Sequence, residues 1–287
     1  MIDIEKIQKE KPIKDLLQFG IINIDKPQGP TSFSVTDYLR KSLNLNKTSH
    51  MGTLDPAVTG VLPILLGRAC RLSDYFMHRN KTYIGIMRVH NDTVSDIDLS
   101  KVIKKFIGKI KQLPPVRSRV KRAIREREVI SFDILEREDK DTLFETEVQA
   151  GTYIRKLIDD IGKEESIGGA HMLELRRTKA GIFDEKKIYN LYEFDEAVKA
   201  YNTDDEDQLR KMITPAEIIS ETLPVVQITD KRLLKQLLTG KPLMERDTKL
   251  DASIKDKFCV FKDNVFIGTY SKVNEGDIIA RAEFVFN

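Results

Sequence analysis

The sequence predicts an α+β protein with a mostly antiparallel central sheet flanked by helices and a small β-rich module at the C-terminus. Several stretches alternate apolar and polar residues, as half-buried strands do, and they follow one another along the chain. Other stretches carry apolar residues at the i, i+3 and i+4 spacing of helices. At 287 residues the chain is longer than one average domain, which favours a large domain with a smaller one appended.

The N-terminal part is predicted to contain a strand, a helix and a long loop. A strand over 20–25 ends at the turn-forming sequence KPQGP over 26–30. In the helix that follows, Ser34 and Asp37 have the spacing of a capping box. The apolar face of this helix would consist of Val35, Tyr38, Leu39 and Leu43. A loop over 49–60 then precedes an apolar run.

The middle of the chain mixes both periodicities. Strands are predicted over 82–90, 129–135 and 143–150, with a helix over 102–107 between the first two. A further helix starts just after Gly151, because four apolar residues fall on one face: Ile154, Leu157, Ile158 and Ile161.

The last part of the chain is predicted to form a separate module. The acidic run over 204–207 is the best candidate for a connecting or surface segment before it. Beyond this run, helical spacing over 230–238 is followed by a terminating Gly240, and strands over 258–262 and 265–270 form a hairpin. We therefore expect one domain over 1–221, which includes an N-terminal extension, and a β-rich module over 222–287.

Composition favours a soluble intracellular protein. Hydrophobic residues make up 40% of the chain and charged residues 32%, which is typical of a globular protein with a real core. No apolar run approaches the roughly 20 residues that span a bilayer, and the N-terminus lacks the apolar stretch of a secretion signal. We therefore expect a cytoplasmic location. Cys70 and Cys259 have no further ligand at metal-binding spacing nearby, so a zinc site is not expected.

Cationic residues gather in one region, although the net charge of +3 is too small to indicate nucleic-acid binding by itself. The region contains Lys109, Lys111, Arg117, Arg119, Lys121, Arg122, Arg125 and Arg127, against the single acid Glu126. A charge run is usually a solvated face, but this imbalance favours phosphate binding, with Arg117, Lys121 and Arg122 as the expected contacts.

One loop carries a candidate catalytic carboxylate. Asp55 precedes Pro56, and by spacing alone such an Asp is most often a turn former that bonds its own backbone. The longer pattern, HMGTLDP over 50–56 and TGVLP over 59–63, resembles the catalytic motif of TruB/dyskerin pseudouridine synthases. Further segments resemble motifs of that family in the same order: GIINIDKPQGPTS over 20–32, KTY over 81–83, AGTYIR over 150–155, and a stretch within 169–178.

The resemblance implies the pseudouridine synthase fold and an RNA isomerase that uses neither a metal nor an organic cofactor. In such an enzyme the uracil base leaves ribose C1′, rotates and rejoins through C5. Asp55 would be the catalytic aspartate, Arg155 the cation that keeps it ionised, and Tyr83 the ring that stacks on a flipped base. Without the resemblance, Arg155 would be read as a solvent-facing arginine and Tyr83 as a core aromatic. The residues implied to contact RNA or to build the pocket are His50, Lys26, Pro27, Tyr153 and Leu175.

Several features resemble the guide-dependent branch of the family. The segment between Val89 and Leu113 is short, the run over 113–122 is similar to that branch, and the chain from Leu223 resembles a PUA module. This branch implies H/ACA guide RNA and substrate RNA as partners, with two small H/ACA core proteins and a kink-turn-binding ribosomal-type protein. The substrate would be ribosomal RNA, and also transfer RNA. The alternatives are a stand-alone enzyme for the transfer RNA T-loop and a non-catalytic RNA-binding scaffold.

Overall fold

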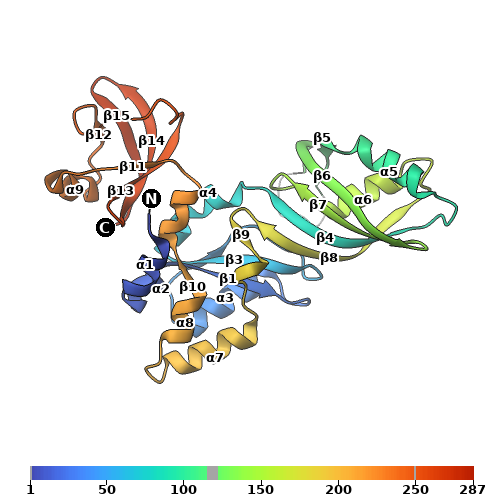
Figure 1. Ribbon diagram of the computed structural model, residues 1–287, viewed down its shortest axis with the longest axis horizontal. Helices are drawn as coiled ribbons and strands as arrows, with labels where there is room; N and C mark the ends of the chain where they lie inside the picture. The colour runs from blue at the N-terminus through green and yellow to red at the C-terminus, as the bar shows by residue number, and fades with distance from the viewer. Residues whose placement is uncertain (1, 115–121, 249) are drawn as a thin grey trace.

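The computed structural model describes residues 2–114, 122–248 and 250–287, which form two β-sheets with helices around them (Figure 1). The strands of the larger, central sheet are β1 (Phe19–Lys26), β2 (Thr48–His50), β3 (Thr59–Gly67), β4 (Lys81–Val89), β5 (Gly108–Gln112), β6 (Arg125–Glu138), β7 (Asp141–Val148), β8 (Ala170–Ala180), β9 (Phe183–Asp184) and β10 (Ile213–Pro215). Their order is β10-β1-β3-β8-β4-β7-β6-β5, with β2 paired to β3 and β9 to β8. Apart from the parallel pair of β3 and β8, the described strand pairs of this sheet are antiparallel, which confirms the predicted class.

The central sheet consists of two halves that meet at a short pairing. β3 and β8 pair at two positions, Thr59 with Arg176 and Gly60 with Arg177. Gly60 has a φ of +100°, and a Cβ atom there would lie 2.2 Å from the carbonyl oxygen of Arg177. Only glycine allows this close approach. Segments that are distant in the sequence therefore come together at this junction.

Helices cover both halves of the sheet. They are α1 (Ile4–Glu10), α2 (Ile13–Gln18), α3 (Ser32–Ser42), α4 (Ser73–Met77), α5 (Asp96–Lys105), α6 (Ile154–Gly162), α7 (Leu191–Tyr201) and α8 (Asp207–Met212), with the 3₁₀ helices η1 (Arg68–Leu72), η2 (Glu185–Lys187) and η3 (Ala216–Glu221). α3 and α7 contact the half that contains β1 and β3, whereas α5 and α6 contact β6 and β8 (Figure 1). The four predicted apolar residues of α6 are all buried, as its spacing indicated. In the described part of the chain, no helix is long and apolar enough to cross a membrane.

The start of α3 differs from the prediction. Thr31 is the N-cap, and its hydroxyl accepts a hydrogen bond from the backbone N–H of Ser34 at 3.0 Å. Ser34, the predicted cap, therefore lies inside the first turn, and Asp37 pairs with Lys41 instead of closing a capping box. Tyr38 is 41% exposed and not part of the buried face, because its hydroxyl donates to Asp195 at 2.5 Å.

The smaller sheet lies at the C-terminal end of the chain. Its strands are β11 (Val225–Gln227), β12 (Leu243–Met244), β13 (Lys257–Lys262), β14 (Val265–Glu275) and β15 (Ile278–Val285), in the order β11-β13-β14-β15-β12. One helix, α9 (Lys231–Leu238), packs on β14 and is followed by Gly240 with a φ of +86°, as expected for a helix terminator. The predicted β13–β14 hairpin is present, with Asp263 at a φ of 53° in its turn.

The acidic run does not connect the two sheets. Asp204, Asp205 and Glu206 lie in the turn between α7 and α8, and Asp207 is the first residue of α8; both helices pack on the larger sheet. The chain passes to the smaller sheet only after η3, over 222–224. Clustered aspartates favour such a turn because their side chains bond nearby backbone, as the Asp205 carboxylate does with the N–H of Asp207 at 3.1 Å. The expectation of a surface segment was right, but its role as a connector was wrong.

Candidate active site at the junction of the half-sheets

The loop that carries Asp55 lies between β2 and β3, at the junction of the two half-sheets. Ser32, the first residue of α3, clamps this loop through Leu54. The Ser32 hydroxyl donates to the Leu54 carbonyl at 3.0 Å and accepts from the Leu54 N–H at 2.8 Å. The loop N–H of Gly29 also donates to the Pro56 carbonyl at 2.9 Å. Hydrogen bonds from the Ser32 side chain and the Gly29 backbone therefore join the first sequence motif to the Asp55 motif.

Lys26 supports the same loop from inside the protein. Its ammonium group is fully buried and donates to the carbonyls of Pro27 at 2.8 Å, Pro56 at 3.2 Å and Val58 at 2.9 Å. Burial lowers the pKa of Lys26, and the nearby Asp55 carboxylate partly opposes this effect. Lys26 thus holds the backbone on the C-terminal side of Asp55, whereas Pro27 is exposed at the surface of the turn.

Asp55 and Arg155 form an ion pair across the junction. The Arg155 Nη2 donates to the Asp55 Oδ2 at 2.7 Å, and the two side chains are 57% and 56% exposed. A pair as exposed as this contributes only about 0–1 kcal/mol to stability. The arrangement therefore leaves a carboxylate open to solvent, oriented by a charge-assisted hydrogen bond.

The start of α6 places Arg155. Tyr153 is the N-cap residue of this helix, and its side chain makes no capping bond. Its backbone is instead held by the buried Gln112 at the end of β5. The Gln112 side chain accepts from the Tyr153 N–H at 3.0 Å and donates to the Tyr153 carbonyl at 3.1 Å. One glutamine therefore sets where the arginine-bearing helix begins.

Tyr83 and Leu175 lie on neighbouring strands beneath the loop. Tyr83 on β4 pairs with Arg177 on β8, and Leu175 pairs with Gly85. Both side chains belong to the core cluster that also contains Leu54. Tyr83 is only 9% exposed, so a base could contact no more than a small part of its ring in this conformation.

His50 at the end of β2 is half-buried. Its Nε2 lies 3.1 Å from the Thr53 hydroxyl, and its Nδ1 lies 3.3 Å from the Thr36 hydroxyl on α3. Burial lowers the pKa of His50, and the Arg177 cation lowers it further. A neutral imidazole is therefore favoured there.

Two buried cations at the site were not singled out from the sequence. Arg177 donates to the carbonyls of Val61 at 2.8 Å and Gly52 at 3.0 Å. Lys81 donates to the carbonyl of Arg79 at 2.6 Å, and burial lowers its pKa to about 8. A charged residue within a strand usually indicates a solvated face, so sequence periodicity alone gave no signal for either side chain.

Four described cations of the basic region, Lys109, Lys111, Arg125 and Arg127, lie on β5 and β6, at the edge of the half-sheet that carries Tyr83. Lys109 pairs with Glu126 at 3.0 Å. Arg122 is exposed just before β6. Arg117 and Lys121 lie outside the described residues. One described cation, Arg127, donates to the carbonyl of Gly151 at 3.1 Å, in the turn that leads to Arg155.

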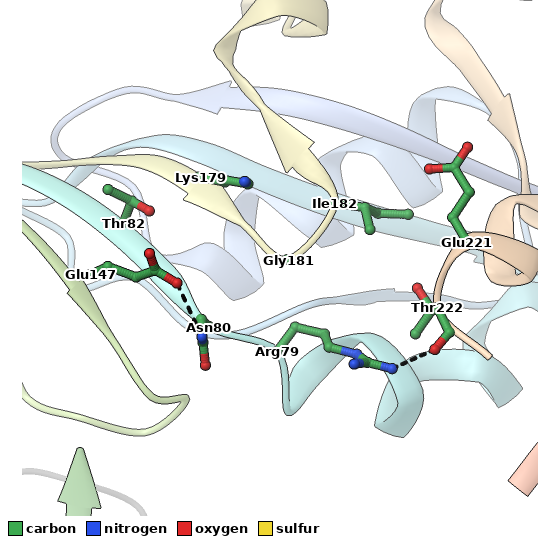
Figure 2. Close-up of a pocket in the computed structure, with 9 residues that line it drawn as sticks. All are labelled: Arg79, Asn80, Thr82, Glu147, Lys179, Gly181, Ile182, Glu221 and Thr222. Atoms are coloured by element: carbon green, nitrogen blue, oxygen red, sulfur yellow. Dashed lines mark hydrogen bonds between the residues drawn. The ribbon is translucent and has the colours of Figure 1, made fainter. Parts of the chain in front are cut away.

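A separate pocket of about 240 Å³ lies near the start of β4 (Figure 2). In it Asn80 donates to Glu147 at 3.0 Å, and Arg79 donates to the carbonyl of Thr222 at 2.5 Å. None of its lining residues is a candidate site residue. The bond from Arg79 to Thr222 joins the turn before β4 to the start of the segment that connects the two sheets.

Two family matches cover the Asp55 loop, Tyr83 and Arg155. Residues 40–154 match the TruB family pseudouridylate synthase N-terminal domain, and residues 155–220 match the tRNA pseudouridylate synthase B C-terminal domain. The chain is 39% identical over 253 residues to a probable tRNA pseudouridine synthase B of Archaeoglobus fulgidus, covering 85% of this chain and 77% of that protein. It is 42% identical over 249 residues to the protein of the same description from Pyrococcus furiosus, covering 86% and 73%.

Solved structures resemble the chain over nearly its whole length. A chain in the crystal structure of a Cbf5-Nop10-Gar1 complex matches with a TM-score of 0.88 and 37% identity, covering 98% of this chain and 88% of that one. A chain in the structure of an H/ACA RNP bound to a substrate RNA containing 2'-deoxyuridine matches with a TM-score of 0.86 and 35% identity, covering 98% and 89%. Together with the sequence identity, these matches show that the chain belongs to the TruB family of pseudouridine synthases, isomerases that act on RNA.

Proposed function

We propose that Asp55 is the catalytic carboxylate of this pseudouridine synthase and that Arg155 orients it. The observation that carries this proposal is the 2.7 Å ion pair between two half-exposed side chains at the junction of the half-sheets. A carboxylate can attack the sugar or base as a nucleophile, or it can remove a proton that lets the glycosidic bond break. In either route the guanidinium keeps a charged oxygen pointed at the reacting atoms.

The remaining site residues would receive the uridine. A uridine within folded RNA must be flipped out, at a cost of a few kcal/mol. Tyr83 and Leu175 would form the apolar floor of the pocket, and contact with the Tyr83 ring would offset part of that cost. His50 and Tyr153 border the same loop and the start of α6, where they would contact the RNA around the flipped nucleotide. Lys26 and Pro27 would act by supporting the loop.

We further propose that the chain is the catalytic subunit of an H/ACA ribonucleoprotein. The resemblance to a chain in a Cbf5-Nop10-Gar1 complex supports this, because it extends over 98% of the chain and so includes the smaller sheet. In this role the guide RNA selects the target uridine by base pairing, in ribosomal RNA and in transfer RNA. The smaller sheet would be a PUA-like RNA-binding module over 222–287, and Arg122 would contact substrate phosphates.

The partners proposed for the chain are a guide RNA, two small H/ACA core proteins and a kink-turn-binding ribosomal-type protein. The test is reconstitution: pseudouridine is measured in a substrate RNA with the chain alone, with guide RNA, and with guide RNA and the three proteins. The expected result is guide-directed modification that requires the assembled particle. Efficient modification of the substrate without any guide would contradict the H/ACA assignment.

A second candidate is a stand-alone enzyme for transfer RNA. The names of the curated relatives and of the match over 155–220 favour it, since both describe a tRNA pseudouridine synthase B. The same reconstitution decides between the two, if unmodified transfer RNA is added as a substrate. Modification of its T-loop by the chain alone, at a rate equal to that of the particle, would favour this second function.

A further inference from the structure

Arg177 occupies the junction of the half-sheets but has no part in the reaction proposed above. Its backbone pairs with Gly60 on β3 and with Tyr83 on β4, and its side chain is 1% exposed. The guanidinium donates from Nε to the carbonyl of Val61 and from Nη2 to the carbonyl of Gly52. Gly52 precedes Asp55 in the sequence, and Val61 follows it. One residue therefore bonds to both ends of the Asp55 loop and pairs directly with Tyr83.

Stability does not account for an arginine at this position. Hydrogen bonds from a charged donor contribute about 1.5–3 kcal/mol each. Removing a cation from water costs several kcal/mol, so the two bonds of Arg177 roughly offset its burial. Within the described ranges, no carboxylate forms an ion pair with it. The guanidinium therefore adds little net stability, which indicates that it is kept because its geometry holds these two carbonyls.

The surroundings of Arg177 are cationic. A Cβ atom on Gly52 would lie 3.5 Å from Arg177 Nη1 and 3.6 Å from Lys81 Cε, so the loop passes directly over both side chains. Arg177 also lowers the pKa values of Lys26, Lys81 and His50. The backbone leading to Asp55 is therefore held above a group of buried cations that bond to carbonyls.

We propose that Arg177 is a positioning residue. Its guanidinium fixes the distance between the Asp55 loop and the strand that carries Tyr83. The inference rests on the proposed function, in which Asp55 is the reacting group. A fork with two donors in a fixed plane can hold two carbonyls at once, whereas a lysine can supply charge without that geometry. A displacement of about 1 Å at a reacting group can lower the rate about 100-fold.

The test compares Arg177→Lys and Arg177→Met in the full chain, under the conditions in which the wild-type chain modifies RNA. Lys179→Met is the matched control, because Lys179 is an exposed cation two residues further along the same strand. The single-turnover rate per folded molecule, the RNA dissociation constant and the thermal unfolding midpoint are measured for each variant. We expect Arg177→Lys to lose roughly 10- to 100-fold in rate with unchanged RNA affinity, and Arg177→Met to lose more. Lys179→Met should match the wild type in rate.

A titration of the His50 C2 proton by NMR reports on the charge beside the loop, and the near-ultraviolet circular dichroism of each variant checks that packing around the ring is kept. Its pKa should rise in Arg177→Met, where the nearby cation is gone, and stay low in Arg177→Lys. If Arg177→Lys reacts at the wild-type rate per folded molecule, the positioning role is overturned. The same holds if rate and RNA affinity fall in parallel. If Arg177→Met does not fold, Arg177→Lys decides the question alone. Activity retained by Asp55→Asn would instead contradict the proposed function, so the two failures are distinguishable.

Discussion

Lys26, Lys81 and Arg177 show how single buried cations organise the backbone of this site. Each donates to main-chain carbonyls. A buried carbonyl that loses its donor costs about 1–3 kcal/mol, so these cations fix the local chain path strongly. Asp55 and Arg155 differ, because their pair is exposed and contributes little to stability. The residues that would react and the residues that hold the fold are thus separate, although they are close together.

Lys81 should make stability depend on pH. Burial lowers its pKa to about 8 in the folded protein, from the ordinary lysine value of 10.5 that holds in the unfolded chain. Between these values the unfolded state binds more protons, so stability rises with pH. The contribution is complete above pH about 10.5 and is lost as the pH falls to about 8. We expect the free energy of unfolding of the wild type, relative to Lys81→Met, to rise by up to about 3 kcal/mol across this window.

The measurement is chemical denaturation from pH 7 to 10.5, with Lys14→Met as the control. Lys14 is exposed, so its removal should leave the pH dependence of the wild type unchanged. A constant difference between wild type and Lys81→Met over the whole window would show that the ammonium group is not desolvated as described.

Among the helices and strands, periodicity predicted those whose buried apolar residues repeat at a regular interval. It missed element boundaries and strands that depend on a single cap or a buried polar side chain. The strands around Tyr83 and the helix that begins at Ile154 were predicted because their apolar residues repeat at the right interval. α5 begins at Asp96 and not near 102, because the Ser95 side chain caps it and accepts from the Asp98 N–H. The 11-residue strand β8 was not predicted, since its buried positions include Arg177. Motif resemblance located Asp55 and Arg155. Only the fold shows that Lys26 and Arg177 both donate to carbonyls of the Asp55 loop and its ends.

The contact between β5 and α6 yields a prediction at this scale. Gln112→Ala removes both hydrogen bonds to the Tyr153 backbone, which should lower the free energy of unfolding by about 1–3 kcal/mol. It should also lower the single-turnover rate with unchanged RNA affinity, because the start of α6 sets the position of Arg155. Gln227→Ala, at an exposed position of the smaller sheet, is the control. A variant that is destabilised but fully active would show that α6 finds its position without Gln112.

At the scale of the whole molecule, the two sheets share an apolar cluster. Phe19 on β1 stacks on Phe266 of β14 at 5.2 Å and on Phe286 at 4.1 Å between ring centroids. The Tyr75 hydroxyl donates to the Thr269 hydroxyl at 2.9 Å, which adds a polar contact. Figure 1 shows both chain termini near one another, between the smaller sheet and the rest of the chain. The position of the C-terminal module relative to the candidate site is therefore fixed by packing, which no local sequence pattern could predict.

Phe266→Ala should destabilise both sheets together. The ring is 1% exposed, and removing a buried phenylalanine costs about 3–5 kcal/mol. Because Phe19 loses its partner, we expect calorimetry to show one cooperative transition that moves to lower temperature. Val265→Ala is the control, since Val265 is 56% exposed on the same strand. Early melting of the smaller sheet, with the larger domain unaffected, would show that the cluster does not couple them.

The most direct test of the central claim is the single-turnover rate of pseudouridine formation by Asp55→Asn. Asparagine keeps the size of the side chain and an oxygen that can accept from Arg155, but it removes the charge and the nucleophile. We expect no detectable pseudouridine, with RNA affinity and unfolding midpoint close to those of the wild type because the pair is exposed. Product formation at the wild-type rate, or a loss of activity that merely follows a loss of RNA binding, would contradict the assignment of Asp55.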